Sequence, residues 1–256
     1  MNFDQIRRYW EERAATDASS QSTTQDVYLR EIEARVLGEQ VTKLRPRRVL
    51  DVGCGDARTT IRLATDHPQS QFSGGDYALS MLKNSAANVA AAGLSNLRIS
   101  KLDVTSPLAD GPFDLVYTTR CLINLSTWEL QRQALDNILG ALTQGGTYVM
   151  IESFIDAQEN FNRVRVAFDL PPIAIRDHNL FFDRALLLKH LGKRIEVVEE
   201  INISSAYYLA SRVLYSRICQ DNKTLPDYFD AHHRYASALP FCGEFGPIRM
   251  LCLKKR

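Results

Sequence analysis

The 256-residue chain has no apolar run long enough to cross a bilayer, for which about 20 consecutive apolar residues are needed. Its first residues, MNFDQIRRYWEERAATD, are polar and resemble neither a secretory signal nor a transit peptide. We therefore expect a cytoplasmic protein with no membrane span.

The chain also lacks a basic block. Its 31 basic side chains are balanced by 30 acidic ones, and aromatic residues do not alternate with Lys and Arg along any strand-like stretch. Proteins that bind nucleic acids use one or both of these features. No nucleic acid is therefore expected as a partner.

Cysteine pairs and clustered acidic residues of the metal-binding kind are missing as well. No C-x-x-C pair occurs, so we expect free thiols, a reducing compartment and no zinc site. No paired acidic residues suggest a magnesium-dependent reaction, and no metal is expected. The five scattered cysteines are Cys54, Cys121, Cys219, Cys242 and Cys252.

What the chain does contain is an alternation of two periodic patterns in its middle part. Hydrophobic residues make up 45% of it, enough for an ordinary globular core. Short apolar runs alternate with amphipathic stretches, a pattern typical of an α/β fold with a mostly parallel sheet and helices on both faces. Strands are expected at 47–52, 70–76, 97–100, 113–119 and 147–153. Helices are expected at 57–68, 78–93 and 126–142, the second ending at Gly93 and the third capped by Ser126 with Glu129.

The flanks of this core are less regular. Residues 1–45 read as an N-terminal helical lid, which can equally be a packing layer over one sheet edge, with the clearest helix at 28–44. Residues 46–153 form the nucleotide-binding core, and 154–256 form a substrate-binding insertion with the final strands of the same structural domain. Within that last part we expect helices at 162–168, 184–191 and 208–219, an extended run at 195–205 and a final strand in FGPIRMLCLKK.

The stretch VLDVGCGDART raises the choice between a dinucleotide and a sulfonium cofactor. Gly53 and Gly55 follow an apolar run, as in a turn where a ligand approaches the backbone closely. A dinucleotide fingerprint would place a third glycine where Arg58 stands. Asp51 puts a carboxylate at the mouth of the loop, unfavourable for a diphosphate and favourable for a cation. The stretch thus favours S-adenosylmethionine over NAD, with Cys54 as a small filler.

Two further acidic residues follow expected strands. Asp76 can accept hydrogen bonds from the ribose hydroxyls, or it can cap the next helix. Asp103 can accept from the adenine amino group, with Val104 donating its backbone amide, or it can be a turn residue. The stretch FDLVYTTRCLINL then brings a fourth strand to the sheet edge where open α/β sheets bind ligands.

With these four features in order, the chain resembles class I S-adenosylmethionine-dependent methyltransferases. The resemblance rests on VLDVGCGDA, GGDYALSML, LDV, FDLVYTTRCLINL and ALTQGGTYVMIES, with Gly75 in place of a large apolar residue and Gln144 in place of Pro. It implies a Rossmann-like seven-stranded sheet with a reversed last strand, S-adenosylmethionine as cofactor and S-adenosylhomocysteine as product. The stretches TRCLINLSTWELQ and DHNLFFD also resemble a bacterial and archaeal subgroup associated with glycan or polysaccharide pathways, although Asp177 replaces its usual Trp.

The cofactor site expected from this pattern also includes residues next to the motifs. The YWEERA stretch adds Tyr9 and Trp10, which are expected to close over the cofactor together with Arg13. The members of this site are Tyr9, Trp10, Asp51, Gly53, Cys54, Gly55, Asp56, Arg58, Asp76, Tyr77, Met81, Asp103, Val104, Thr119 and Arg120.

Methyl transfer to a hydroxyl needs a group that removes a proton, and histidine suits this role near neutral pH. Of the five histidines, His178 lies in an aromatic, half-buried stretch of the insertion, where it is either a catalytic base or a structural hydrogen-bonding group. His67 is expected at the surface, and His232 and His233 in a polar segment.

The acceptor is expected to contact side chains near the fourth and fifth strands and in the insertion. Arg120 and Arg165 suit a carboxylate or phosphate on the acceptor. Tyr207 and Tyr208 can stack on a sugar or an aromatic ring, with core packing as the alternative. The expected substrate-binding residues are Arg120, Asn124, Glu152, Asn162, Arg165, His178, Asn179, Tyr207 and Tyr208.

Several functions stay open at this point. The first is O-methylation of a small polar or saccharide-type acceptor by in-line displacement, by a monomer or homodimer. The second is N-methylation of a small natural product, which needs no base. More remote readings are an NAD-dependent oxidoreductase and a non-catalytic binding module.

Overall fold

The computed structural model describes residues 1–17, 19 and 23–256 of the chain. Across these residues one seven-stranded sheet forms the centre, with the strand order β3-β2-β1-β4-β5-β7-β6. Strands β1 to β5 are parallel, and β7 runs antiparallel to both of its neighbours. This confirms the Rossmann-like sheet with a reversed last strand. The strands are β1 (Arg48–Val52), β2 (Gln71–Asp76), β3 (Leu97–Lys101), β4 (Phe113–Thr119), β5 (Leu142–Ser153), β6 (Ile195–Asn202) and β7 (Ile248–Lys255).

Helices cover both faces of the sheet. They are α1 (Phe3–Thr16), α2 (Val27–Leu44), α3 (Arg58–Asp66), α4 (Leu79–Ala92), α5 (Trp128–Ala141), α6 (Ile155–Ala167), α7 (Arg184–Leu191), α8 (Ser205–Tyr208), α9 (Tyr215–Asp221) and α10 (Ala231–Ser237). A π-helical turn, Leu209–Leu214, joins α8 to α9. Among the described residues, no helix is both long and apolar enough to cross a membrane.

The central strands are apolar on both sides because each face carries a hydrophobic core. In β5, Tyr148 and Met150 join one core with residues of α5 and α7, while Val149 and Ile151 join the other with residues of α2 and α3. Successive side chains of a strand point to opposite faces, so a strand buried on both sides reads as a continuous apolar run. The predicted runs at 113–119 and 147–153 have this form.

Helix ends follow local capping rules, with two corrections. Gly93 ends α4 with a φ of +64°, as predicted. Ser126 does not cap α5: the side chain of Thr127 accepts a hydrogen bond from the Leu130 amide at 3.3 Å. The prediction missed this because both residues are good caps and stand side by side. Helix α6 begins at Ile155, seven residues before the predicted 162.

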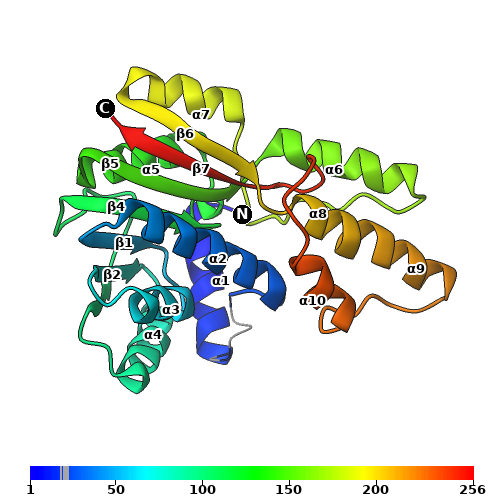
Figure 1. Ribbon diagram of the computed structural model, residues 1–256, viewed down its shortest axis with the longest axis horizontal. Coiled ribbons are helices and arrows are strands. Elements are labelled where there is room, and N and C mark those ends of the chain that lie inside the picture. Colours follow the sequence, from blue (N-terminus) through cyan, green and yellow to red (C-terminus); the bar gives the residue numbers. More distant parts are fainter. Residues whose placement is uncertain (18, 20–22) are drawn as a thin grey trace.

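The strand order changes direction between β1 and β4. The chain leaves β3 at one edge and returns to pair β4 with β1, so the carboxyl ends of β1 and β4 lie at the point where open α/β sheets bind ligands. Figure 1 shows α6, α8, α9 and α10 gathered beyond this end of the sheet. Helix α1 packs against α4.

Candidate active site

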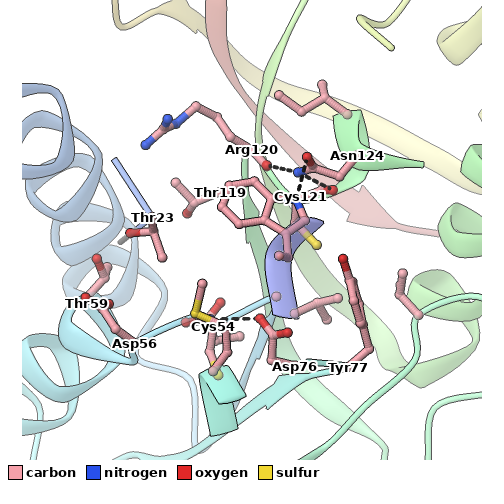
Figure 2. Close-up of a pocket in the computed structure, with 18 of the residues that line it drawn as sticks. Thr23, Cys54, Asp56, Thr59, Asp76, Tyr77, Thr119, Arg120, Cys121 and Asn124 are labelled. Atoms are coloured by element: carbon pink, nitrogen blue, oxygen red, sulfur yellow. Dashed lines mark hydrogen bonds between the residues drawn. The ribbon is translucent and has the colours of Figure 1, made fainter. Parts of the chain in front are cut away.

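A cavity of about 190 Å³ opens at the carboxyl ends of β1, β2 and β4, and we call it the glycine-loop cavity. Figure 2 shows Asp56, Cys54, Asp76 and Tyr77 along one side of it and Arg120, Cys121 and Asn124 along the other. Sequence-predicted residues that line it are Trp10, Asp51, Gly53, Cys54, Gly55, Asp56, Asp76, Tyr77, Met81, Val104, Thr119, Arg120, Asn124, His178 and Asn179.

The glycines shape the floor of this cavity. Gly53 has a φ of +79° and Gly55 a φ of +53°, in the left-handed region that favours glycine. The amide of Gly53 donates to the Gly75 carbonyl at 2.8 Å, which ties the loop to β2. A Cβ on Gly53 would lie 2.3 Å from Sγ of Cys121, so no other residue fits there without displacing the opposite wall.

Asp76 links the glycine loop to the start of α4. Its carboxylate accepts hydrogen bonds from the amides of Gly55 at 3.0 Å and Ala78 at 2.9 Å. Burial raises the pKa of Asp76, and these backbone hydrogen bonds oppose the rise. A carboxylate has about four acceptor positions, so this capping role leaves room for a further donor such as a ribose hydroxyl.

Asp51 lies deeper than the sequence indicates. It is 4% exposed, and one carboxylate oxygen accepts from Thr60 Oγ1 at 2.5 Å and Tyr117 Oη at 2.9 Å. As predicted, Asp51 stands near the end of the first strand, and although buried it lines the glycine-loop cavity. Burial raises its pKa to about 7, against the effect of the two hydrogen bonds.

The cavity contains polar atoms that no protein group satisfies. Tyr77 Oη and Thr119 Oγ1 are buried and have no hydrogen-bond partner among the described residues. Buried polar atoms are normally paired, so both are available to a polar ligand. Burial and the nearby carboxylates also raise the pKa of Cys54 well above its usual value, which keeps the thiol neutral and suits a space-filling role.

Three predicted cofactor residues lie outside the lining of this cavity. Asp103 accepts from Thr105 and pairs with Arg7 at 3.5 Å. Arg58 is exposed and pairs with Asp56 at 3.3 Å. Tyr9 lines the neighbouring cavity described below. Val104, the residue after Asp103, lines the glycine-loop cavity instead.

Helix α2 supplies charged residues that the sequence reasoning missed. Arg30 lines the glycine-loop cavity, contacts Thr23 and pairs with Asp56 at 3.5 Å. Glu33, one turn on, binds both the Nε and a terminal nitrogen of Arg120, at 2.7 and 3.1 Å. The available signal was their i, i+3 spacing, which puts both on one face of the helix. Arg120 is therefore already neutralised by a carboxylate.

A second cavity, of about 300 Å³, adjoins the first, and we call it the strap cavity. Part of its wall is residues 169–182, which connect α6 to α7 and which we call the strap. Other parts come from α1, α6 and the segment around α8. The two cavities share Trp10, Thr23, Arg120, Ile123, Arg176 and Asn179, so they meet at these residues.

Two predicted substrate residues fix the strap and line neither cavity. Asn162 makes hydrogen bonds to both the amide and the carbonyl of Ile173, at 2.9 and 3.1 Å. Arg165 donates to the carbonyls of Pro171, at 2.8 Å, and Arg212. Their side chains are therefore engaged by backbone groups of Ile173, Pro171 and Arg212.

His178 is the predicted catalytic residue, and the strap places it in the glycine-loop cavity. Its ring stacks on Tyr9 with centroids 4.7 Å apart and meets the edge of Trp10 at 5.9 Å. Burial, followed by the positive charge of Arg176, lowers the pKa of His178. The imidazole is therefore neutral at pH 7, the form that can accept a proton.

Other histidines differ from the sequence expectation. His67, the C-cap of α3, is only 9% exposed, so its predicted surface position was wrong. His233 is 1% exposed, although its neighbours in sequence are polar. It packs against tyrosines from α2, α8, α9 and the 222–230 loop, a tertiary cluster that no local pattern indicates.

Three more predicted substrate residues have other surroundings. Glu152 is fully buried and accepts hydrogen bonds from the amides of Cys121 and Leu122, so it holds the turn after β4. Tyr207 donates to Asp26 at 2.6 Å and lines neither cavity. Tyr208 lines the strap cavity.

Comparisons with known proteins agree with this geometry. A family described as a methyltransferase domain matches residues 49–146. The O-methyltransferase rstn1 of Aspergillus nomiae is 26% identical over 77% of this chain and 83% of its own length. The malonyl-[acyl-carrier protein] O-methyltransferase of Methylovorus sp. is 26% identical over 70% of this chain and 68% of its own.

Among solved structures, the N-methyltransferase NodS of Bradyrhizobium japonicum, in complex with S-adenosyl-L-homocysteine, covers 98% of both chains with a TM-score of 0.61 and 13% identity. At this identity the likeness establishes the fold. The chain thus contains a methyltransferase domain at residues 49–146, has the Rossmann-like fold of its structural neighbour and is an S-adenosylmethionine-dependent methyltransferase.

Proposed function

We propose that the glycine-loop cavity binds S-adenosylmethionine, that the strap cavity binds a small polar or saccharide-type acceptor, and that the enzyme methylates an oxygen of that acceptor. The observation that carries this proposal is the junction of the two cavities at six shared residues. A donor and an acceptor bound on its two sides would be brought into line, which is the main requirement of an in-line displacement.

The chemistry of the glycine-loop cavity supports this cofactor. S-adenosylmethionine carries an ammonium and a sulfonium, and the cavity has four lining carboxylates, Glu33, Asp51, Asp56 and Asp76, against three arginines. We assign the ribose to Asp76. We assign the cofactor's carboxylate to Arg30, which comes from α2 and contacts the same cavity.

His178 lines the glycine-loop cavity between the shared residues Arg176 and Asn179, and it is the proposed base for an acceptor hydroxyl that reaches this junction. When bound, the cofactor supplies an activated methyl group with a good leaving group. His178 would take the acceptor proton on a ring nitrogen, and Tyr9 and Trp10 hold the plane of that ring. General-base assistance of this kind contributes about 10²- to 10⁴-fold.

Relatives named O-methyltransferases favour an oxygen acceptor. The fold is shared with a protein named an N-methyltransferase, so N-methylation is the second candidate. It would need no base. A cytoplasmic location and a monomeric or homodimeric state stay predictions.

A thermal-shift titration tests the cofactor. S-adenosylhomocysteine at 100 times its Kd should raise the stability by about 2.7 kcal/mol, with no effect of NAD. Stabilisation by NAD alone would overturn the proposal.

A substitution at His178 tests the base. His178→Ala should lower kcat by at least about 100-fold. The control is His190→Ala, at a histidine that pairs with Asp136 on α5. Unchanged turnover in His178→Ala would exclude the base role and favour the N-methylation alternative.

A further inference from the structure

The strap cavity differs in charge from the glycine-loop cavity. Four arginines, Arg13, Arg120, Arg176 and Arg212, line it, against one carboxylate, Asp26, among the described residues. A concave site whose lining carries one sign of charge concentrates ligands of the opposite sign. The strap cavity therefore suits an anion, whereas the glycine-loop cavity suits a cation.

Two of these arginines are committed to carboxylates. Arg120 binds Glu33 through two nitrogens. Arg212 is buried, donates to Asp26 and lies over the ring of Tyr228, with 4.2 Å to its centroid. Each pair is close to neutral, so neither guanidinium has its full charge available to a ligand.

Arg176 is different. It lines both cavities, and among the described residues no carboxylate lies within ion-pair distance of it. Its charge acts on His178, two residues along, where it helps to lower the pKa of the imidazole. The guanidinium thus lies at the junction of donor and acceptor sites with its donors uncommitted.

Hydrogen bonds anchor the strap backbone on both sides of Arg176. On the α6 side, Gln158 and Asn162 bind the backbone of Ile173. On the other side, the amide of Leu180 donates to the carbonyl of Ile123 at 2.7 Å, and Gln131 donates to the carbonyl of Leu180 at 2.9 Å. These bonds fix the backbone on either side of Arg176, whose side chain is exposed and whose planar guanidinium matches the geometry of an oxyanion.

We infer that the methyl acceptor is an anion carrying a carboxylate or phosphate, and that Arg176 is the residue that recognises this group. The inference rests on the proposed function, since it assigns the acceptor to the strap cavity. The acceptor's body would lie against the aromatic side chains of that cavity, among them Tyr9 and Tyr208, which suit the apolar face of a sugar ring or an aromatic ring. Arg176 thus takes the anion-binding role predicted for Arg165.

The test uses the full chain saturated with S-adenosylhomocysteine, and matched probes that differ in charge. The probes are glucuronate with glucose, 4-hydroxybenzoate with 4-hydroxybenzamide, and phenyl phosphate with phenol, each titrated by calorimetry. The wild-type protein should bind at least one anion about tenfold more tightly than its neutral partner, the size expected of one charge-assisted hydrogen bond. The first two pairs report a carboxylate and the third a phosphate.

Arg176→Gln should abolish this preference, and Arg176→Lys should keep part of it. The control is Arg132→Gln, which removes the same charge from the exposed face of α5, away from both cavities. Equal binding of anion and neutral partner in all three pairs would overturn the inference, as would an unchanged preference in Arg176→Gln.

Binding of S-adenosylhomocysteine separates this inference from the proposed function. Arg176→Gln should bind it within about threefold of the wild type, because Arg30 is assigned to the cofactor's carboxylate. A tenfold loss of that affinity with an unchanged anion preference would place Arg176 in the cofactor site and overturn the inference alone. No binding of S-adenosylhomocysteine by the wild type would instead overturn the proposed function.

Discussion

The two cavities of the active site are built in different ways. The glycine-loop cavity is built around the ends of three neighbouring strands, with side chains of α1, α2 and the strap added, and its lining has four carboxylates and three arginines. The strap cavity is formed by long side chains from α1, α6, the strap and the segment around α8, and arginines dominate its charge. A cationic cofactor and an anionic acceptor would thus each meet a lining of opposite sign.

The two cavities should therefore differ in how strongly their geometry depends on the sheet. The glycine-loop cavity depends on backbone angles and on hydrogen bonds within the sheet, so its geometry is tied to the fold. The strap cavity depends on where the strap lies between α6 and α7. Substitutions should therefore affect cofactor and acceptor separately, except at the six residues that the cavities share.

The largest effect is expected from Gly53→Ala. The new Cβ would meet Sγ of Cys121 at 2.3 Å in a backbone with a φ of +79°, and we expect a loss of stability of about 2–5 kcal/mol and no measurable binding of S-adenosylhomocysteine. Gly93→Ala is the matched control, since it has a φ of +64° but no atom within 4 Å of the added Cβ. Chemical denaturation and calorimetry measure both. Equal losses in the two variants would show that backbone strain alone is responsible.

A smaller effect is expected from Asp76→Ala. This change leaves the amides of Gly55 and Ala78 without their acceptor and removes the proposed ribose partner. Affinity for S-adenosylhomocysteine should fall by about 10- to 100-fold, with stability lowered by about 1–3 kcal/mol. Asp66→Ala, on the exposed end of α3, should change neither. If affinity falls while anion binding in the strap cavity stays intact, the two cavities are separable.

Affinity for S-adenosylmethionine should depend on pH through Asp51. Its pKa is raised to about 7, so below pH 7 the folded protein must release this proton before the carboxylate can face a cation. Affinity should rise by up to about tenfold between pH 6 and 8. Asp51→Asn should flatten that rise in a calorimetric titration. A pH-independent affinity in the wild type would mean that the cofactor's cationic groups lie far from Asp51.

The raised pKa of Asp51 also makes the free energy of unfolding depend on pH. The unfolded carboxyl ionises near pH 4, and the folded one near pH 7, so the folded state binds more protons between these values. The free energy of unfolding therefore falls as the pH rises from 4 to 7. Glu152, whose pKa burial also raises to about 7, should leave part of this slope in Asp51→Asn.

The smallest effect is expected from Asn162→Ala. It removes two hydrogen bonds between α6 and Ile173 of the strap, at an exposed position, and should cost about 1 kcal/mol of stability. Anion affinity in the strap cavity should fall a few-fold, with no change in binding of S-adenosylhomocysteine. Arg163→Ala, on the solvent side of the same helix, is the control. A strap that tolerates Asn162→Ala without any loss of anion affinity would show that its other anchors suffice.

The cofactor side of the site could be predicted from the sequence because its features depend on residues close together in the chain. Gly53 and Gly55 are required by backbone angles, and the apolar runs of β1, β4 and β5 are required by burial on both faces, so the sequence carries both signals within a few residues. Where sequence reasoning erred locally, as with Ser126 and Thr127, two residues of equal capping ability stood next to each other.

The sequence by itself determined the parallel sheet and the glycine loop, because each follows from the properties of neighbouring residues, whereas the reversed final strand was predicted only through the resemblance to methyltransferases. The tertiary structure alone decided which arginine side chains are available to bind a ligand. Glu33 neutralises Arg120 from 87 positions away, Asp26 binds Arg212 across 186, and Arg165 turns to backbone carbonyls. Pairing over such separations depends on how helices and connections pack, and that packing brings Arg176 to the junction of the two cavities with no carboxylate beside it among the described residues.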